Sequence, residues 1–162
     1  MINCSKLLQS TKTLNEIKRY SAVKEEAPKW MLRYSKTASP IVVWNVTKKC
    51  NLSCAHCYIN AVGEEESEAD MGELTTREAM GMIEDLAAIK APMLAFSGGE
   101  PLLRNDIYEL NVYAMKLGLR TILSTNSTLI TREVAKKIKE AGFVYVGVSL
   151  DGSEEAHDRF RG

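Results

Sequence analysis

Met93-Leu94-Ala95-Phe96-Ser97-Gly98-Gly99-Glu100-Pro101 (residues 93–101) is the stretch of sequence that decides the fold. A short apolar run, typical of a buried strand, leads into a glycine pair, a carboxylate and a proline. A helical pattern then opens with Asp106 and Glu109 and is closed by Gly118. The order of strand, glycine turn and helix indicates one βα unit of an α/β protein.

Similar units flank this one on both sides. Thr75 and Glu78 have the spacing of a capping box, which predicts a helix that runs to Lys90 and stops before Pro92. Composition and periodicity add a strand over 41–46, a strand over 121–125, a helix over 131–141 and a strand over 143–150. Four strands that alternate with three helices predict right-handed βαβ units and a parallel sheet.

An unusual segment follows each predicted strand. The carboxyl ends of parallel strands gather along one edge of a sheet, where α/β proteins build their sites. A single site is therefore expected to collect a cysteine-rich loop and three polar turns, namely residues 50–57, 98–101, 124–126 and 149–152.

The composition describes one globular domain. Of 162 residues, 45% are hydrophobic and 26% charged, a balance that excludes a disordered or repetitive chain. Residues 1–39 show no sustained period and are expected to form an N-terminal extension to a main fold over residues 40–162. No apolar run approaches the roughly 18 residues of a membrane span, and no signal peptide opens the chain. We expect a cytoplasmic protein without a membrane partner.

The charges are unevenly distributed although they sum to zero. Residues 1–60 hold ten basic and three acidic residues, and residues 61–162 hold eleven basic and eighteen acidic. The basic part suits either a docking surface for an anionic partner or an ordinary solvated surface. Basic residues interleaved with aromatic ones are lacking, so nucleic acid is not an expected partner.

Three of the four cysteines lie within eight residues, at Cys50, Cys54 and Cys57. In a reducing compartment this spacing points to metal or redox chemistry rather than to disulfides. Three thiolates suit zinc or an iron–sulfur cluster, and both commonly take a fourth protein ligand. Cys4 is distant in the sequence, and His56 is too close to Cys57 to serve comfortably beside it. A third possibility is an iron that is left open for an exogenous ligand.

The other turns are weaker signals when each is taken alone. Gly98 and Gly99 let the backbone approach a ligand, and Glu100 offers a carboxylate to an amine, although a glycine pair is also common in plain turns. The remaining candidates are either turn formers or surface charges when taken singly, and they are Ser124, Asn126, Ser149, Asp151, Arg159 and Arg161.

Together these motifs resemble the radical S-adenosylmethionine (radical SAM) superfamily. The resemblance is carried by Cys50-Asn51-Leu52-Ser53-Cys54-Ala55-His56-Cys57-Tyr58, by Gly98-Gly99-Glu100-Pro101, and by Ser149-Leu150-Asp151-Gly152 with His157-Asp158-Arg159-Phe160-Arg161-Gly162. It covers residues 41–162. The sequence departs from the pattern at Ser127, where many members have glycine.

The resemblance implies an α/β fold, the N-terminal portion of a partial (β/α)6 TIM-like barrel that is truncated after about four strands. It implies that Cys50, Cys54 and Cys57 bind three irons of a 4Fe-4S cluster and that S-adenosylmethionine (SAM) chelates the fourth. The residues that it assigns to SAM are Gly98, Gly99, Glu100, Asn126, Ser149, Asp151, Arg159 and Arg161.

A narrower likeness concerns the substrate. The last segment resembles members with a SPASM or twitch extension, and the opening residues resemble NirJ-like and AhbC-like enzymes of haem biosynthesis. This implies a radical SAM enzyme that acts on a sirohaem-derived tetrapyrrole and is reduced by flavodoxin or ferredoxin. The alternatives are a SPASM-type maturase with a peptide substrate and, outside enzymes, a zinc or iron–sulfur binding module. The zinc or iron–sulfur module would leave residues 98–101 and 149–152 unexplained.

Overall fold

The computed structural model describes residues 40–63 and 72–162. The expected N-terminal extension and Cys4 lie outside the described residues. The elements follow in the order β1 (Val42–Asn45), α4 (Thr76–Ala88), β2 (Leu94–Ser97), the 3-10 turn η2 (Pro101–Leu103), α5 (Ile107–Lys116), β3 (Thr121–Thr125), α6 (Arg132–Ala141), β4 (Tyr145–Val148) and α7 (Glu154–Arg161). In this part of the chain, no helix has the length and apolar character that crossing a membrane requires.

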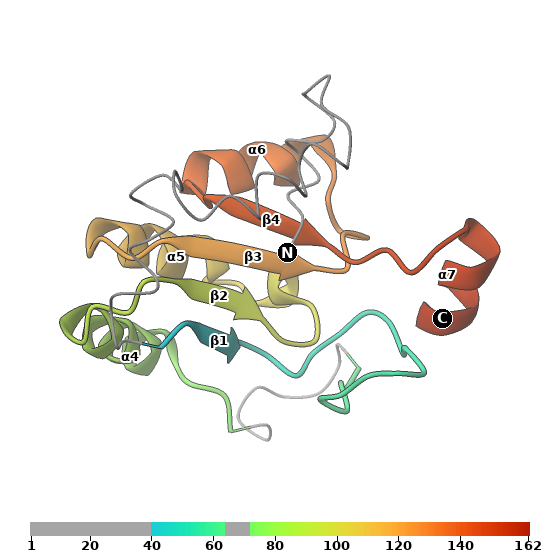
Figure 1. Ribbon diagram of the computed structural model, residues 1–162, viewed down its shortest axis with the longest axis horizontal. Helices are drawn as coiled ribbons and strands as arrows, with labels where there is room; N and C mark the ends of the chain where they lie inside the picture. Colours follow the sequence, from blue (N-terminus) through green and yellow to red (C-terminus); the bar gives the residue numbers. More distant parts are fainter. Residues whose placement is uncertain (1–39, 64–71) are drawn as a thin grey trace, which may run out of the picture. The chain divides into compact units, whose positions relative to one another are not determined.

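The four strands form one parallel sheet in the order β1-β2-β3-β4. The predicted α/β class and the predicted alternation of strands and helices are confirmed (Figure 1). Because all four strands run parallel, their carboxyl ends lie along one edge of the sheet, as the site requires.

One face of the sheet packs against the helices. Leu94 and Phe96 of β2 and Leu123 of β3 are fully buried there, against Ile107 and Leu110 of α5 and other apolar residues. Helix α5 packs between α4 and α6. More buried and less buried residues alternate along β1, β2 and β3, which is the expected pattern for strands with one face against helices.

The expected ends of α5 and α6 are correct, whereas α4 ends at Ala88 and not at Lys90. Thr75 and Glu78 form the complete capping box, and Gly142 ends α6 in the left-handed conformation. Asp106 stands at the N-cap of α5 but its side chain makes no capping hydrogen bond. It binds the guanidinium of Arg104 instead, with Nε and Oδ1 2.6 Å apart.

Arg104 is the buried cation that joins three segments next to the site. It is 7% exposed and donates from Nη1 to the carbonyl of Val46 at 2.9 Å and from Nη2 to the carbonyl of Leu74 at 2.8 Å. Its guanidinium carbon lies 5.4 Å from the ring centre of Trp44. The planar fork thereby fixes the end of β1, from which the cysteine loop departs.

We predict that Arg104→Lys destabilises the fold by about 1–3 kcal/mol, because one ammonium cannot serve two carbonyls and a carboxylate in these directions. Urea unfolding measures the change. Arg132→Lys, an exposed cation at the start of α6, is the matched control and should stay within about 0.5 kcal/mol of the parent. Equal stability of the two variants would contradict this assignment.

Candidate functional site

The cysteine loop leaves β1 and is held at both ends by backbone hydrogen bonds. The N–H of Cys50 donates to the carbonyl of Val62 at 2.9 Å, and the N–H of Val62 donates to the carbonyl of Lys48 at 2.9 Å. The thiols of Cys50, Cys54 and Cys57 are free and half-buried. Within the described residues, no three His, Cys, Asp or Glu side chains converge on one ion-sized position.

The glycine turn lies directly against the start of this loop. The N–H of Gly99 donates to the carbonyl of Thr47 at 2.9 Å, and the N–H of Glu100 donates to the carbonyl of Lys49 at 2.8 Å. A Cβ on Gly98 would come within 2.4 Å of the Thr47 oxygen, and one on Gly99 within 2.1 Å of the Lys49 oxygen. The close approach predicted for these glycines is therefore made to the loop's own backbone.

Glu100 is completely buried, and its carboxylate connects this turn to the end of β3. Oε1 accepts from the N–H of Leu102 at 3.0 Å and from the hydroxyl of Thr125 at 2.8 Å, and Oε2 accepts from the N–H of Asn126 at 2.8 Å. Burial raises the pKa of Glu100, and these three hydrogen bonds oppose that rise. A buried carboxylate of this kind favours a cationic neighbour.

Asn126 points toward the cysteine loop. Its Nδ2 lies 2.9 Å from Oδ1 of Asn51 and 3.9 Å from Sγ of Cys50. The next residue, Ser127, takes a φ of 71°, in the left-handed region that glycine occupies without strain. This explains why glycine is common at that position in the sequences that the chain resembles.

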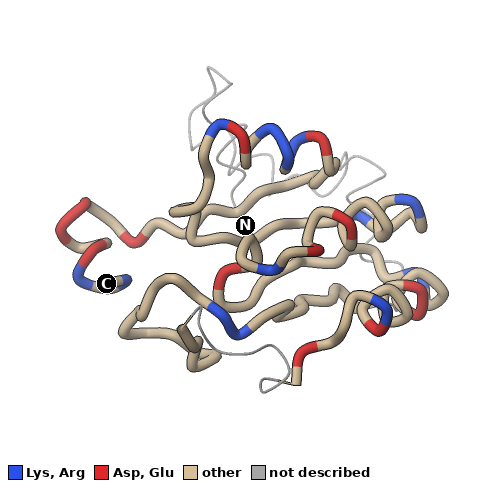
Figure 2. Tube along the Cα trace, turned by 180° about the vertical axis from the view of Figure 1, so that it is seen from behind, with Lys and Arg blue, Asp and Glu red and all other residues tan. Residues whose placement is uncertain are grey.

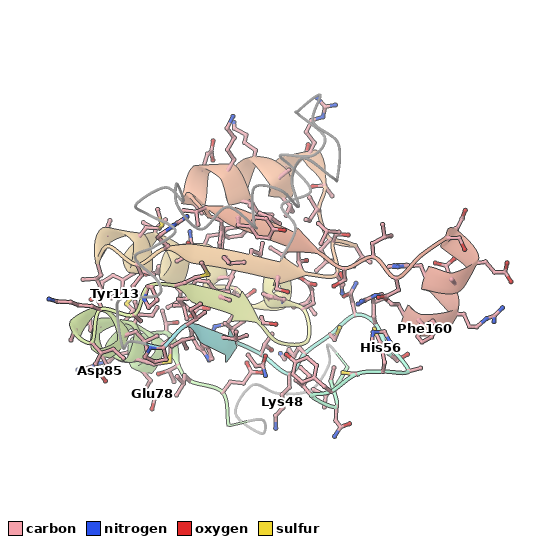
Figure 3. The ribbon with its side chains drawn as sticks, viewed as in Figure 1. Lys48, His56, Glu78, Asp85, Tyr113 and Phe160 are labelled. Carbon is pink, nitrogen blue, oxygen red and sulfur yellow. The ribbon has the colours of Figure 1, made fainter. Side chains whose placement is uncertain are left out.

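Helix α7 lies beside the cysteine loop, away from the sheet (Figure 1). The N–H of Ala55 donates to the carbonyl of Phe160 at 2.9 Å, and the rings of His56 and Phe160 meet edge to face with centres 5.6 Å apart. Figure 3 shows these two side chains next to each other. The end of α7 thus supports the middle of the loop.

Arg161 and Asp151 form an ion pair at this contact. Nε of Arg161 donates to Oδ2 of Asp151 at 2.6 Å, and Nε2 of His56 lies 4.0 Å from the same oxygen. The hydrogen bond from Arg161 lowers the pKa of Asp151, while the pair with Asp151 raises the pKa of Arg161. Interaction with the sulfur of Cys54 also contributes to the raised pKa of Arg161. Figure 2 shows the acidic start and basic end of α7.

The site edge therefore holds most of the residues that the sequence singled out. Ser149 lies at the end of β4, where its N–H donates to the carbonyl of Thr125 at 3.1 Å. Arg159 is the exception, because its side chain is 74% exposed and pairs with Glu155 one turn earlier on α7. Sequence reasoning missed Asn51 and Thr128, which bond each other at 2.7 Å between Nδ2 and Oγ1. The Asn-x-Thr spacing of residues 126–128, typical of an Asx turn, was the available signal for Thr128.

We predict that Gly99→Ala destabilises the protein by about 1–3 kcal/mol or more, because its Cβ would overlap the Lys49 carbonyl. Urea unfolding, together with protease cleavage within residues 50–63, measures the effect on the loop. Gly63→Ala is the control, because a Cβ there meets no atom within 4 Å. If Gly99→Ala is as stable in urea and as resistant to protease as Gly63→Ala, the close packing of Gly99 against Lys49 is not needed to hold the loop.

Comparison with known proteins identifies relatives whose similarity covers the sheet and the loops described above. The family model described as Radical SAM superfamily matches residues 44–162. The chain is 48% identical over 162 residues to the Fe-coproporphyrin III synthase of Methanosarcina barkeri strain Fusaro, covering 100% of this chain and 40% of that protein. It is 44% identical over 126 residues to the AdoMet-dependent heme synthase of the same organism, covering 77% of this chain and 35% of that protein.

A solved structure, anSMEcpe with bound AdoMet, superposes with a TM-score of 0.57 at 26% identity, over 75% of this chain and 35% of that one. The chain spans less than half the length of the relatives that it matches. The family match covers the end of β1, the cysteine loop, the glycine turn and strands β2 to β4, and it agrees with the parallel α/β sheet and with the motifs that the sequence carries. The chain belongs to the radical SAM superfamily.

Proposed function

We propose that this chain is the cluster-binding and SAM-binding part of a radical SAM enzyme that modifies a sirohaem-derived tetrapyrrole. The observation that carries the proposal is the direct backbone pairing of the cysteine loop with the turn at residues 98–101. That pairing holds the start of the loop that carries three cysteines against a turn with a buried carboxylate, at the edge where parallel sheets bind their ligands.

The donor set fits a 4Fe-4S cluster. Cys50, Cys54 and Cys57 would each hold one iron, and SAM would complete the fourth. The irons of a cube stand at separate corners, so its thiolates need not converge on one point. Hydrogen-bond donors are already directed at the loop's sulfurs, since the N–H of Ala61 lies 3.5 Å from Sγ of Cys57.

When bound, the cluster and SAM would supply one-electron chemistry, namely reductive cleavage of SAM and abstraction of hydrogen from the substrate. The chain's own residues bind and orient the groups around it. Of the residues that the sequence singled out for SAM, we assign the contacts to Gly98, Gly99, Glu100, Ser149, Asp151 and Arg161. Arg159 pairs with Glu155 on the exposed side of α7, and the side chain of Asn126 is bonded to Asn51 and Thr128.

Glu100 would hold the amino group of SAM. Its Oε2 accepts one hydrogen bond from the protein, from Asn126, and an anionic oxygen has capacity for another. Because burial raises the pKa of Glu100, a neighbouring ammonium would stabilise the charged carboxylate, and the carboxylate would in turn orient the ammonium.

The names of the relatives support the tetrapyrrole substrate. The alignment with the Fe-coproporphyrin III synthase extends over the whole of this chain, and the heme synthase matches most of it. A peptide substrate is the alternative within the same superfamily. We propose flavodoxin or ferredoxin as the electron donor, in keeping with the basic charge of residues 1–60.

We predict that Cys54→Ala abolishes cluster assembly, since two thiolates on one loop cannot fix the three protein-held corners of the cube. Iron and sulfide analysis after anaerobic reconstitution, with an optical spectrum, measures cluster content. Cys4→Ala is the control and should retain the parent's iron and sulfide. Loss of the cluster in the Cys4 variant would overturn the ligand assignment, and a colourless zinc-containing parent would overturn the proposed function.

We predict that Glu100→Gln weakens SAM binding by roughly tenfold to a hundredfold, because a charge-assisted hydrogen bond to the amine is lost. The dissociation constant for SAM should rise and the yield of deoxyadenosine should fall. Both are measured on protein whose cluster content equals that of the parent. Glu140→Gln, an exposed change on α6, is the matched control. If Glu100→Gln binds SAM as tightly as Glu140→Gln, Glu100 acts only inside the fold.

A further inference from the structure

Asn126 uses every hydrogen-bonding group of its side chain next to the cysteine loop. It is 8% exposed. Nδ2 donates to Oδ1 of Asn51 at 2.9 Å and to Sγ of Cys50 at 3.9 Å. Oδ1 accepts from the N–H of Thr128 at 3.0 Å and from its hydroxyl at 2.8 Å. The amide's two donors and two acceptor positions are thereby filled.

The orientation of this amide is determined by its partners. A backbone N–H can only donate, so the group that faces the N–H of Thr128 must be the oxygen of Asn126, and the NH₂ must face Cys50. Asn51 closes the arrangement, because its Nδ2 donates to the hydroxyl of Thr128 at 2.7 Å. Asn126 donates to Asn51, Asn51 to Thr128, and Thr128 back to Asn126, which forms a closed ring.

The backbone of Asn126 is fixed as well. Its N–H donates to the buried Oε2 of Glu100 at 2.8 Å. The hydroxyl of Thr125 both donates to Glu100 and accepts from the N–H of Ser127 at 2.9 Å. An N–H donor held on both sides in this way approaches a sulfur in one direction only, and it does not rearrange when the charge on that sulfur changes.

Cys50 is the sulfur that this donor reaches. Its thiol is half-buried, and Nδ2 of Asn126 lies 3.9 Å from its Sγ. At a half-buried sulfur little water surrounds the charge, so a fixed N–H donor has a larger effect than it would have in water.

We propose that Asn126 is a positioning residue that acts through Cys50: its NH₂ donates to the cluster thiolate and raises the reduction potential of the cluster. The physical reason is that reduction adds negative charge to the cluster and its sulfurs, and a fixed donor stabilises the reduced state more than the oxidised one. This inference rests on the proposed function, because it requires the 4Fe-4S cluster, and it gives Asn126 a role that contact with SAM does not require.

The test is a potentiometric titration of the reconstituted protein without SAM, followed by its optical and electron paramagnetic resonance signals. Asn126→Ala should shift the midpoint potential to more negative values with iron and sulfide content unchanged. Asn126→Asp, which keeps the acceptor for Thr128 and replaces the NH₂ with an anionic oxygen, should shift it further in the same direction. Asn105→Ala, which removes an exposed asparagine outside the cysteine loop, is the matched control, with a potential close to the parent's.

The outcomes separate this inference from the proposed function. If the parent protein assembles no iron–sulfur cluster, the proposed function itself is refuted, whatever the variants do. A parent with a cluster, and Asn126 variants with the parent's potential, would refute the role of Asn126 alone. If both Asn126 variants lose the cluster while Asn105→Ala keeps it, Asn126 serves assembly and not potential, which also overturns the inference.

Discussion

Two hydrogen bonds between backbones hold this site together. The N–H groups of Gly99 and Glu100 donate to the carbonyls of Thr47 and Lys49, which continues the pairing of β1 with β2 beyond the ends of both strands. A side chain at Gly98 or Gly99 would prevent this close approach of the two backbones. Because of this contact, the cysteine loop and the turn that carries Glu100 form one rigid unit. A ligand that binds to both finds the loop and the turn at a fixed distance from each other.

Glu100 extends the same body to the third strand. A buried carboxylate is costly unless its oxygens are hydrogen-bonded, and three donors satisfy this one. One of those donors is the backbone of Asn126, whose side chain reaches back to Cys50. Glu100 thus contacts the cysteine loop in two ways, directly through its backbone N–H and indirectly through its carboxylate and Asn126.

Helix α7 supports the opposite side of the cysteine loop by different means. Its contacts with the loop include the backbone hydrogen bond from Ala55 to Phe160 and the aromatic pair of His56 and Phe160, and the ion pair of Arg161 with Asp151 lies beside them. The ion pair of Arg161 with Asp151 is partly exposed, and such pairs contribute little to stability by themselves. Their value here is directional, because they orient a cation toward Cys54 and an acidic group toward His56.

The sequence by itself determined the order of the elements, the parallel sheet and the motifs of the family, because these depend on local patterns. A capping box spans four residues, and the periodic spacing of apolar residues is contained within one helix or one strand. The partners of the side chains were decided by the tertiary structure. Asn126 and Cys50 are 76 residues apart, and Glu100 and Asn126 are 26 apart, so no local pattern indicates their contacts. The direction of a side chain's hydrogen bonds depends on which backbone donors other strands bring to it, and only the folded sheet brings them.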